Sequence, residues 1–107
     1  MYYRTYSGFI NKIISIKNFN EREYLLNGFY INKDTIKKAS YNIIDILEEG
    51  DYVNGYPIYE IIEYPDNTKA IVIADDNESI IWEENSQYIK SIVTKEQFEQ
   101  MAYKVGE

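Results

Sequence analysis

Two residue types that carry much of protein chemistry are missing from this chain of 107 residues, which contains no cysteine and no histidine. The absence of cysteine excludes disulfides, thiolate nucleophiles and cysteine-ligated zinc. The absence of histidine removes the commonest general base and the commonest metal ligand. No P-loop, GxGxxG or GxSxG pattern occurs either. We therefore expect a protein that is not an enzyme and that uses no cofactor or metal.

Long apolar runs are also missing. No segment approaches the roughly 20 apolar residues that a membrane-spanning helix requires. The opening stretch MYYRTYSGFINKIISI is polar and rich in tyrosine, which is unlike a secretory signal peptide. We expect a soluble cytoplasmic protein with no membrane partner.

The residues that are present favour a compact β-protein. Hydrophobic residues make up 45% of the chain and aromatic residues 16%, which is enough for a core. The many isoleucines and the 12 tyrosines favour strands over helices. We predict a single β-rich domain over 1–107. Its fold class is mainly β, a small SH3-like or related antiparallel barrel with a short C-terminal helix.

Turn signals divide the first half into short elements. A strand is predicted from Gly8 to Lys17. Asn27-Gly28 predicts a two-residue hairpin, because both central positions of a type I′ turn need positive φ. Residues 34–49 fit two interpretations, a strand near 34–40 followed by a helical turn at 42–47, or one helix over 35–48.

The second half continues as a meander. Gly50 ends the preceding element and Asn54-Gly55 forms a hairpin or a bulge. The following strand is expected to begin near Ile58, because Pro57 lacks an amide donor. Turns at 65–68 and 75–78 then separate strands at 58–64, 69–74 and 79–84.

A capping box, Thr94-Lys95-Glu96-Gln97, predicts a C-terminal helix. Phe98 and Met101 are spaced to dock that helix, and residues 103–105 suggest a last strand. The repeated Asn-Gly pair is interpreted as convergent turn chemistry rather than as an internal repeat.

The net charge of −7 is unevenly distributed along the chain. Residues 1–40 carry a net charge of +4, whereas residues 41–107 carry −11. The acidic part should repel nucleic acid and attract a basic partner protein. A nucleic-acid patch at Lys33, Lys37 and Lys38 is set aside because three lysines are few against this charge.

Two acidic stretches are candidate partner-binding sites. The first, EEGDYVNGY, is either two plain turns or a binding lip of tyrosines rimmed by carboxylates, formed by Glu48, Glu49, Asp51, Tyr52 and Tyr56.

The second stretch, ADDNESIIWEE, brackets the only tryptophan with acids. It is either a solvated turn or an acidic patch, formed by Asp75, Asp76, Glu78, Trp82, Glu83 and Glu84. An EF-hand loop is rejected, since the sixth position from Asp75 is Ile80 rather than glycine.

Part of the sequence resembles a known group of proteins. Residues 43–55, which end in GDYVNG, and the segment SIVTKEQFE at 91–99 are similar to small proteins of phages and prophages of low-GC Gram-positive bacteria. That group carries no assigned activity, so the resemblance implies phage origin.

The function expected from these observations is occlusion. The acidic face would cover a basic surface of a host protein that works in nucleic-acid binding or antiviral defence. The alternatives are sequestration of a nucleotide signal by Arg4, Lys12 and Arg22, and a structural, self-associating role in the phage.

Overall fold

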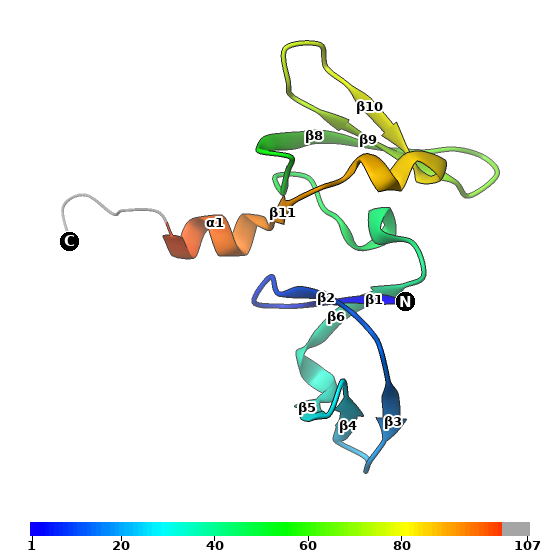
Figure 1. Cartoon of the computed structure of the whole chain (residues 1–107), viewed down its shortest axis with the longest axis vertical. Coiled ribbons are helices and arrows are strands. Elements are labelled where there is room, and N and C mark those ends of the chain that lie inside the picture. The colour runs from blue at the N-terminus through cyan, green and yellow to red at the C-terminus, as the bar shows by residue number, and fades with distance from the viewer. Residues whose placement is uncertain (102–107) are drawn as a thin grey trace. The chain divides into compact units, whose positions relative to one another are not determined.

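The structure is a computed structural model that describes residues 1–101. The chain divides into two compact units, unit 1 (Met1–Ile46) and unit 2 (Leu47–Glu107). Both units are built from short antiparallel strands, and one short α-helix follows the last strand (Figure 1). The predicted class, mainly β with a short C-terminal helix, is confirmed. The expectation of a single domain stays a prediction.

Unit 2 has the connectivity of an SH3-like barrel. Its five strands pair in the order β10-β9-β8-β7-β11, so the last strand returns to pair with the first. A 3-10 segment, η3, precedes that return. The long strand β8 bends at a bulge between Ile58 and Glu60 and so serves both halves of the sheet. The elements are β7 (Tyr52–Val53), β8 (Tyr56–Glu63), β9 (Lys69–Ile73), β10 (Ile80–Trp82), η3 (Glu83–Tyr88), β11 (Ile92–Val93) and α1 (Lys95–Met101).

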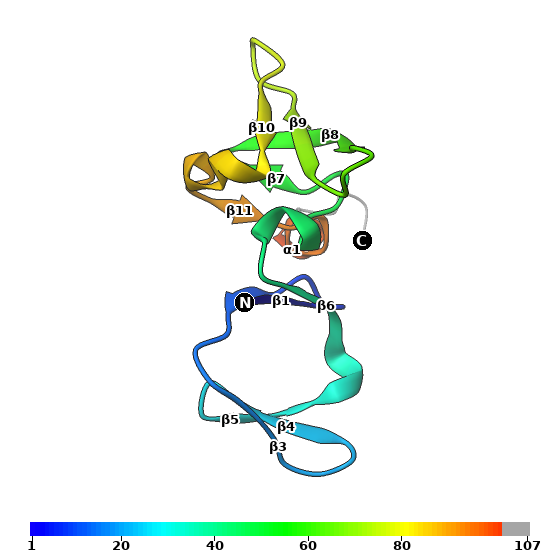
Figure 2. The ribbon, with the colours of Figure 1, turned by 90° about the vertical axis from the view of Figure 1, so that its right-hand side faces the viewer.

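Unit 1 contains two three-stranded sheets, ordered β2-β1-β6 and β3-β4-β5 (Figure 2). All their pairings are antiparallel. The elements are β1 (Tyr2–Thr5), β2 (Ile10–Lys12), β3 (Ile16–Asn18), β4 (Glu23–Leu26), β5 (Phe29–Asn32), η1 (Lys33–Thr35), β6 (Ile36–Ser40) and η2 (Ile43–Ile46).

The two units share one pairing scheme that starts at different strands. In unit 1, β4 turns into β5, η1 and β6 follow, β6 pairs with β1, β1 with β2, and β3 returns to pair with β4. In unit 2, β7 turns into β8, β8 pairs with β9, β9 with β10, and β11 returns to pair with β7. Unit 1 is therefore a circular permutation of the unit 2 scheme, with β5 and β6 together in place of β8. The sequence shows no collinear repeat because permutation changes the order of the segments.

Each Asn-Gly hairpin fixes the strand that returns beside it. In unit 2, the Asn54 side chain donates to the carbonyl of Tyr88 and accepts from the amides of Lys90 and Ser91. The Asn54 amide donates to the Ser91 carbonyl. This clamp holds the chain immediately before β11, and it uses both the donor and the acceptor of the side chain.

Unit 1 repeats the same clamp with the same spacing. The Asn27 side chain donates to the carbonyl of Lys12 and accepts from the amides of Ile14 and Ser15. The Asn27 amide donates to the Ser15 carbonyl. Asn27 and Asn54 have φ of 50° and 53°, and the glycines that follow have φ of 84° and 85°. The predicted type I′ hairpin chemistry is thus confirmed, and it carries a second role that turn rules alone do not describe.

Most predicted elements form, with several corrections. The strand expected over Gly8–Lys17 is divided into β2 and β3, and β1, η3 and β11 were not predicted. Within residues 34–49, the end of η1 is followed by β6 and then by η2, which confirms the strand followed by a helical turn, although the strand begins at Ile36, and excludes the single helix. Residues 83 and 84 belong to η3 rather than to the preceding strand. The strand predicted at residues 103–105 lies outside the described residues.

Strand β8 begins earlier than predicted, at Tyr56, and includes Pro57. Pro57 lies opposite Tyr52, and its carbonyl accepts a hydrogen bond from the amide of Ala74. The hydrogen bond to β7 is instead donated by the amide of Ile58 to the carbonyl of Asp51. Proline is accepted here because the ladder takes its donor from the next residue.

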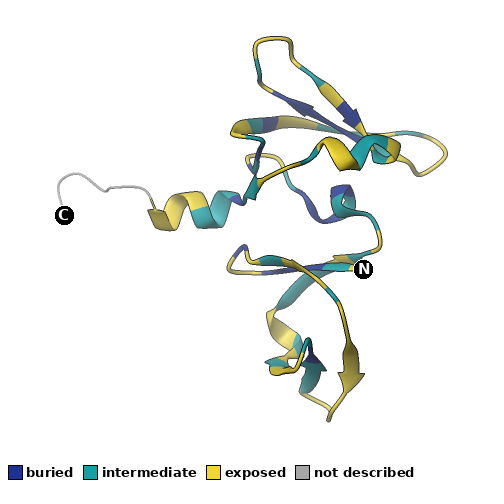
Figure 3. Cartoon of the chain, in the orientation of Figure 1, coloured by how far each residue is buried: buried dark blue, intermediate teal, exposed yellow. Residues whose placement is uncertain are grey.

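The two units differ in how well they are packed. Unit 2 has a buried core on β7, β8, β9 and β10, formed by Val53, Ile58, Ala70, Ile71, Val72, Ile73 and Ile81. In unit 1 the buried apolar side chains are Tyr3, Leu26, Ile44 and Ile46. Figure 3 shows the contrast as continuous dark blue on β9 and extensive yellow on β3 and β5. Each fully buried aliphatic side chain contributes about 1.5–3 kcal/mol, so unit 2 holds most of this stabilisation.

Candidate functional site

Asp51, expected at the rim of a binding lip, is completely buried instead. One carboxylate oxygen accepts from the amide of Glu48 and the other from the amide of Lys95. The second bond places this carboxylate at the N-terminus of α1, where negative charge is favourable. Asp51 therefore joins the turn before β7 to the helix, and it does not form part of the surface.

Glu48, also expected at the rim of the lip, instead forms an ion pair with Lys95. Its carboxylate lies 2.8 Å from Nζ of Lys95, and the Glu48 side chain is only 12% exposed. This hydrogen bond raises the pKa of Lys95 above its ordinary value of 10.5. Glu49, the next residue, is exposed.

The two tyrosines of the predicted lip have different surroundings. The ring of Tyr52 stacks on Phe98 of α1, with ring centres 4.8 Å apart and planes 23° apart. This contact confirms Phe98 as a docking residue, whereas Met101 is 68% exposed. Tyr56 is 42% exposed and is available for contact. The EEGDYVNGY stretch therefore builds mainly the junction between β7 and α1.

Asp75 shapes the turn between β9 and β10. One of its oxygens accepts from the amides of Asn77 and Ser79, and the other accepts from the Ser79 hydroxyl at 2.6 Å. The hydroxyl bond is the main reason that the pKa of Asp75 lies below its ordinary value. Asp76 and Glu78 are exposed on the same turn.

The remaining acids lie on either side of a half-exposed tryptophan. Trp82 is 41% exposed, and its indole nitrogen donates to the hydroxyl of Tyr64 at 3.2 Å. Glu83 is half-buried and accepts from the amide of Lys69, whereas Glu84 is exposed. Trp82, Asp76, Glu78 and Glu84 thus keep the surface position that was predicted for them.

The strand register adds residues that sequence reasoning did not select. Glu60, Val72 and Ile80 form one row across β8, β9 and β10, and the next row on the same face is Ile62, Ala70 and Trp82. The central residues Val72 and Ala70 are buried, while Ile80 is 41% exposed. We call Glu60, Ile62, Ile80 and Trp82 the tryptophan face. The alternation along β8 and β10 indicates which residues share a face within each strand, but only the pairing shows that the two strands flank β9 and present these residues on the same face.

The three cations proposed for a nucleotide differ in their exposure. Arg4 is buried, and its guanidinium donates to the carbonyl of Ile46 at 3.1 Å. Lys12 and Arg22 are exposed on β2 and just before β4. Unit 1 does contain a cavity, but none of these three residues lines it.

Comparisons with protein-family models, with curated proteins and with solved structures find no match. Within residues 1–101, no group of three or more acidic side chains is arranged to hold a metal ion. No helix in this part of the chain is long and apolar enough to cross a membrane.

Proposed function

We propose that this is a non-enzymatic binding protein of phage origin that covers a basic surface of a host protein. The observation that carries the proposal is the tryptophan face, where the part-exposed side chains of Ile80 and Trp82 on β10 share one face of the sheet with Glu60 on β8, two strands away. The exposed acids Asp76, Glu78 and Glu84 lie close to it in sequence, at either end of β10.

This combination suits an occluding surface. A large aromatic side chain gives most of the affinity in many protein interfaces, because it buries much area with few rotatable bonds. Surrounding carboxylates mainly increase the association rate and select a basic partner. The net charge of −11 over residues 41–107 supplies a long-range field of the same sign. The partner class supported by this reasoning is a protein with a lysine- and arginine-rich functional surface, such as a nucleic-acid-binding or antiviral-defence protein.

The test is a pull-down from a lysate of a low-GC Gram-positive host, washed at low and at high salt. The tagged protein is compared with Trp82→Ala, with the double variant Glu60→Lys/Glu84→Lys, and with the matched control Glu49→Lys/Glu99→Lys. The two double variants change net charge equally, but the control charges lie neither on the tryptophan face nor in the segments that flank β10. A basic protein that is captured by the parent and the control, and lost with the other two variants, is expected.

Equal loss of the partner in both double variants would show that overall charge, rather than this face, drives binding. If Trp82→Ala still captured the partner, Trp82 would not be the aromatic anchor of the interface, contrary to the proposal. Sedimentation of the purified protein separates the remaining alternative, since a self-associating structural protein would form concentration-dependent oligomers without any host partner.

A further inference from the structure

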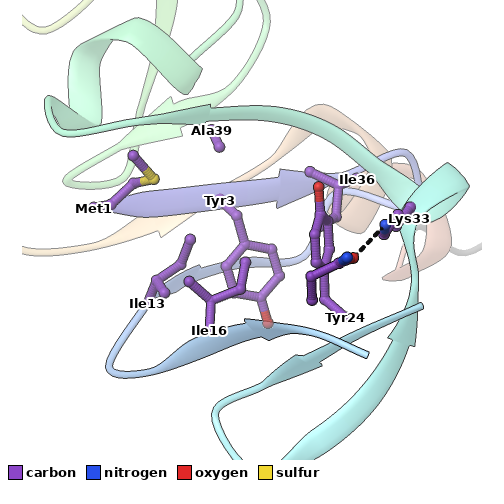
Figure 4. Close-up of a pocket in the computed structure, with 9 residues that line it drawn as sticks. Met1, Tyr3, Ile13, Ile16, Tyr24, Lys33, Ile36 and Ala39 are labelled. Carbon is purple, nitrogen blue, oxygen red and sulfur yellow. Dashed lines mark hydrogen bonds between the residues drawn. The ribbon is translucent and has the colours of Figure 1, made fainter. Parts of the chain in front are cut away.

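Unit 1 contains an open cavity between its two sheets. Its volume is about 490 Å³, and apolar or aromatic side chains form most of its wall. The rings of Tyr3 and Tyr24 and the side chains of Ile13, Ile16 and Ile36 point into this space from β1, β4, β6 and the segment around β3 (Figure 4). Cavities of about 300–1,000 Å³ with mainly apolar walls are typical of small-molecule sites.

The pairing scheme itself does not require this space. In unit 2 the strand at the same place of the scheme is fully buried, since β9 contributes Ile71 and Ile73, 0% and 4% exposed. The corresponding strand of unit 1, β1, contributes Tyr3, but Ile16 on the opposite wall remains 45% exposed. An apolar wall left exposed to water is unfavourable, and a guest molecule that covers it gains the corresponding burial energy.

One lysine lies on the wall of this mainly apolar space. Nζ of Lys33 is 4.7 Å from the centre of the Tyr24 ring and donates a hydrogen bond to the side-chain oxygen of Asn18 at 2.5 Å. An ammonium group has three donors, so these contacts leave capacity for an anion. The Tyr3 hydroxyl is protonated at neutral pH, since its ordinary pKa is 10.0 and burial raises that pKa further, so it can also donate.

We propose that this cavity binds a small aromatic anion, with its ring system between Tyr3 and Tyr24 and its carboxylate or sulfonate on Lys33. The tyrosine rings select a flat aromatic body, and the one lysine side chain of the lining selects one negative charge rather than the several of a nucleotide phosphate chain. The site lies wholly within unit 1 and is independent of the tryptophan face.

Two fluorescent probes with the same aromatic body test the charge requirement. Anilinonaphthalene sulfonate is anionic, and phenylnaphthylamine is its neutral counterpart. We expect saturable binding of the anionic probe at one site per chain. Lys33→Met should weaken the anionic probe about tenfold and leave the neutral probe nearly unchanged, since one partly exposed charge-assisted contact is lost.

Lys37→Met is the matched control. Lys37 also lies over a tyrosine ring, 5.9 Å from the centre of Tyr6, but it does not line the cavity. Its substitution should leave both affinities unchanged. If Lys33→Met and Lys37→Met weakened binding of the anionic probe equally, the effect would come from the overall charge of the protein, and the proposal would be overturned.

A second variant tests the location. Ala39 lines the cavity from β6 and is exposed, so Ala39→Phe adds volume at a strand position that tolerates an aromatic residue. Both probes should lose affinity at least tenfold, and amide NMR shifts caused by the anionic probe on the parent protein should centre on residues 1–3, 13–18, 24 and 33–39. Probe binding that survives in Ala39→Phe, or shifts centred on unit 2, would contradict the site.

Discussion

At the residue scale, Asp51 has the clearest energetic consequence. Its carboxylate satisfies the amides of Glu48 and Lys95, which belong to segments far apart in sequence. Asp51→Ala leaves two part-buried amides without this acceptor, and each such loss costs about 1–3 kcal/mol. We expect the free energy of unfolding to fall by about 3 kcal/mol, measured by urea denaturation followed through Trp82 fluorescence. Glu49→Ala, in the same turn but exposed, should change it by less than about 0.5 kcal/mol.

Asp75 gives a pH-dependent prediction. Its pKa is lowered chiefly by the Ser79 hydroxyl, so the folded state favours the charged carboxylate. The resulting stabilisation is present above the unfolded-state value of 3.8 and disappears as the pH falls through the lower folded-state pKa. Ser79→Ala should move the Asp75 pKa upward toward 3.8, as measured by carboxyl carbon NMR. An unchanged pKa would show that the hydroxyl is not the cause.

The candidate acids were predictable only in part. Acidic side chains are usually exposed, so the sequence favoured the surface for all of them, and Glu49, Asp76, Glu78 and Glu84 are indeed exposed. Asp51 is buried instead, where it accepts a hydrogen bond from the amide of Lys95 at the start of α1. That contact depends on the tertiary structure. Local sequence contains no signal for such a long-range acceptor.

At the scale of elements, the asparagine clamps extend the role of the hairpins. Asn54→Ala removes three side-chain hydrogen bonds and places alanine at φ of 53°. We expect a loss of about 4 kcal/mol in the free energy of unfolding, from three hydrogen bonds of about 1 kcal/mol each and from backbone strain of about 1 kcal/mol. Asn67→Ala is the control, since Asn67 has φ of 69° in the turn after β8 and should lose only the strain of about 1 kcal/mol. Similar losses in both variants would mean that the clamp adds little.

Elements with strong local chemistry were predicted well. Both Asn-Gly hairpins, the proline turn at 65–68 and the capping box form as expected, with Thr94 and Gln97 bonded in both directions. The missed strands β1 and β11 are short, and β11 exists because the Asn54 clamp and β7 hold it. Such strands depend on partners that are remote in sequence, which propensity cannot identify.

At the scale of the whole molecule, the difference in packing predicts a difference in local stability. Strand β9 is paired on both sides, and residues 70–73 are buried. Strands β3 and β5 are edge strands of a sheet beside an open cavity. We expect the slowest amide hydrogen exchange on β9 and exchange at least tenfold faster on β3 and β5, measured by NMR under native conditions. Equal protection in the two units would contradict the expected difference.

The shared pairing scheme was beyond the reach of sequence reasoning. The mainly β class follows from composition and turn spacing, because these are local properties. The permuted strand order does not follow from local properties, because it depends on which strands pair across long stretches of sequence. The segments around Asn27 and Asn54 can be aligned only as short pieces that occur in a different order.

The permutation has a consequence for folding kinetics. In unit 1 the returning pair joins Ile16 to Leu26, which are near neighbours in sequence, whereas in unit 2 it joins Val53 to Ile92. Closing a short loop costs less entropy and occurs faster. The same pairing is therefore local in sequence in unit 1 and long-range in unit 2. In unit 1 the long-range pairing is the one between β1 and β6, which joins Tyr2 to Ser40. The β3–β4 pair should form before the transition state of unit 1, and the β7–β11 pair should form after that of unit 2.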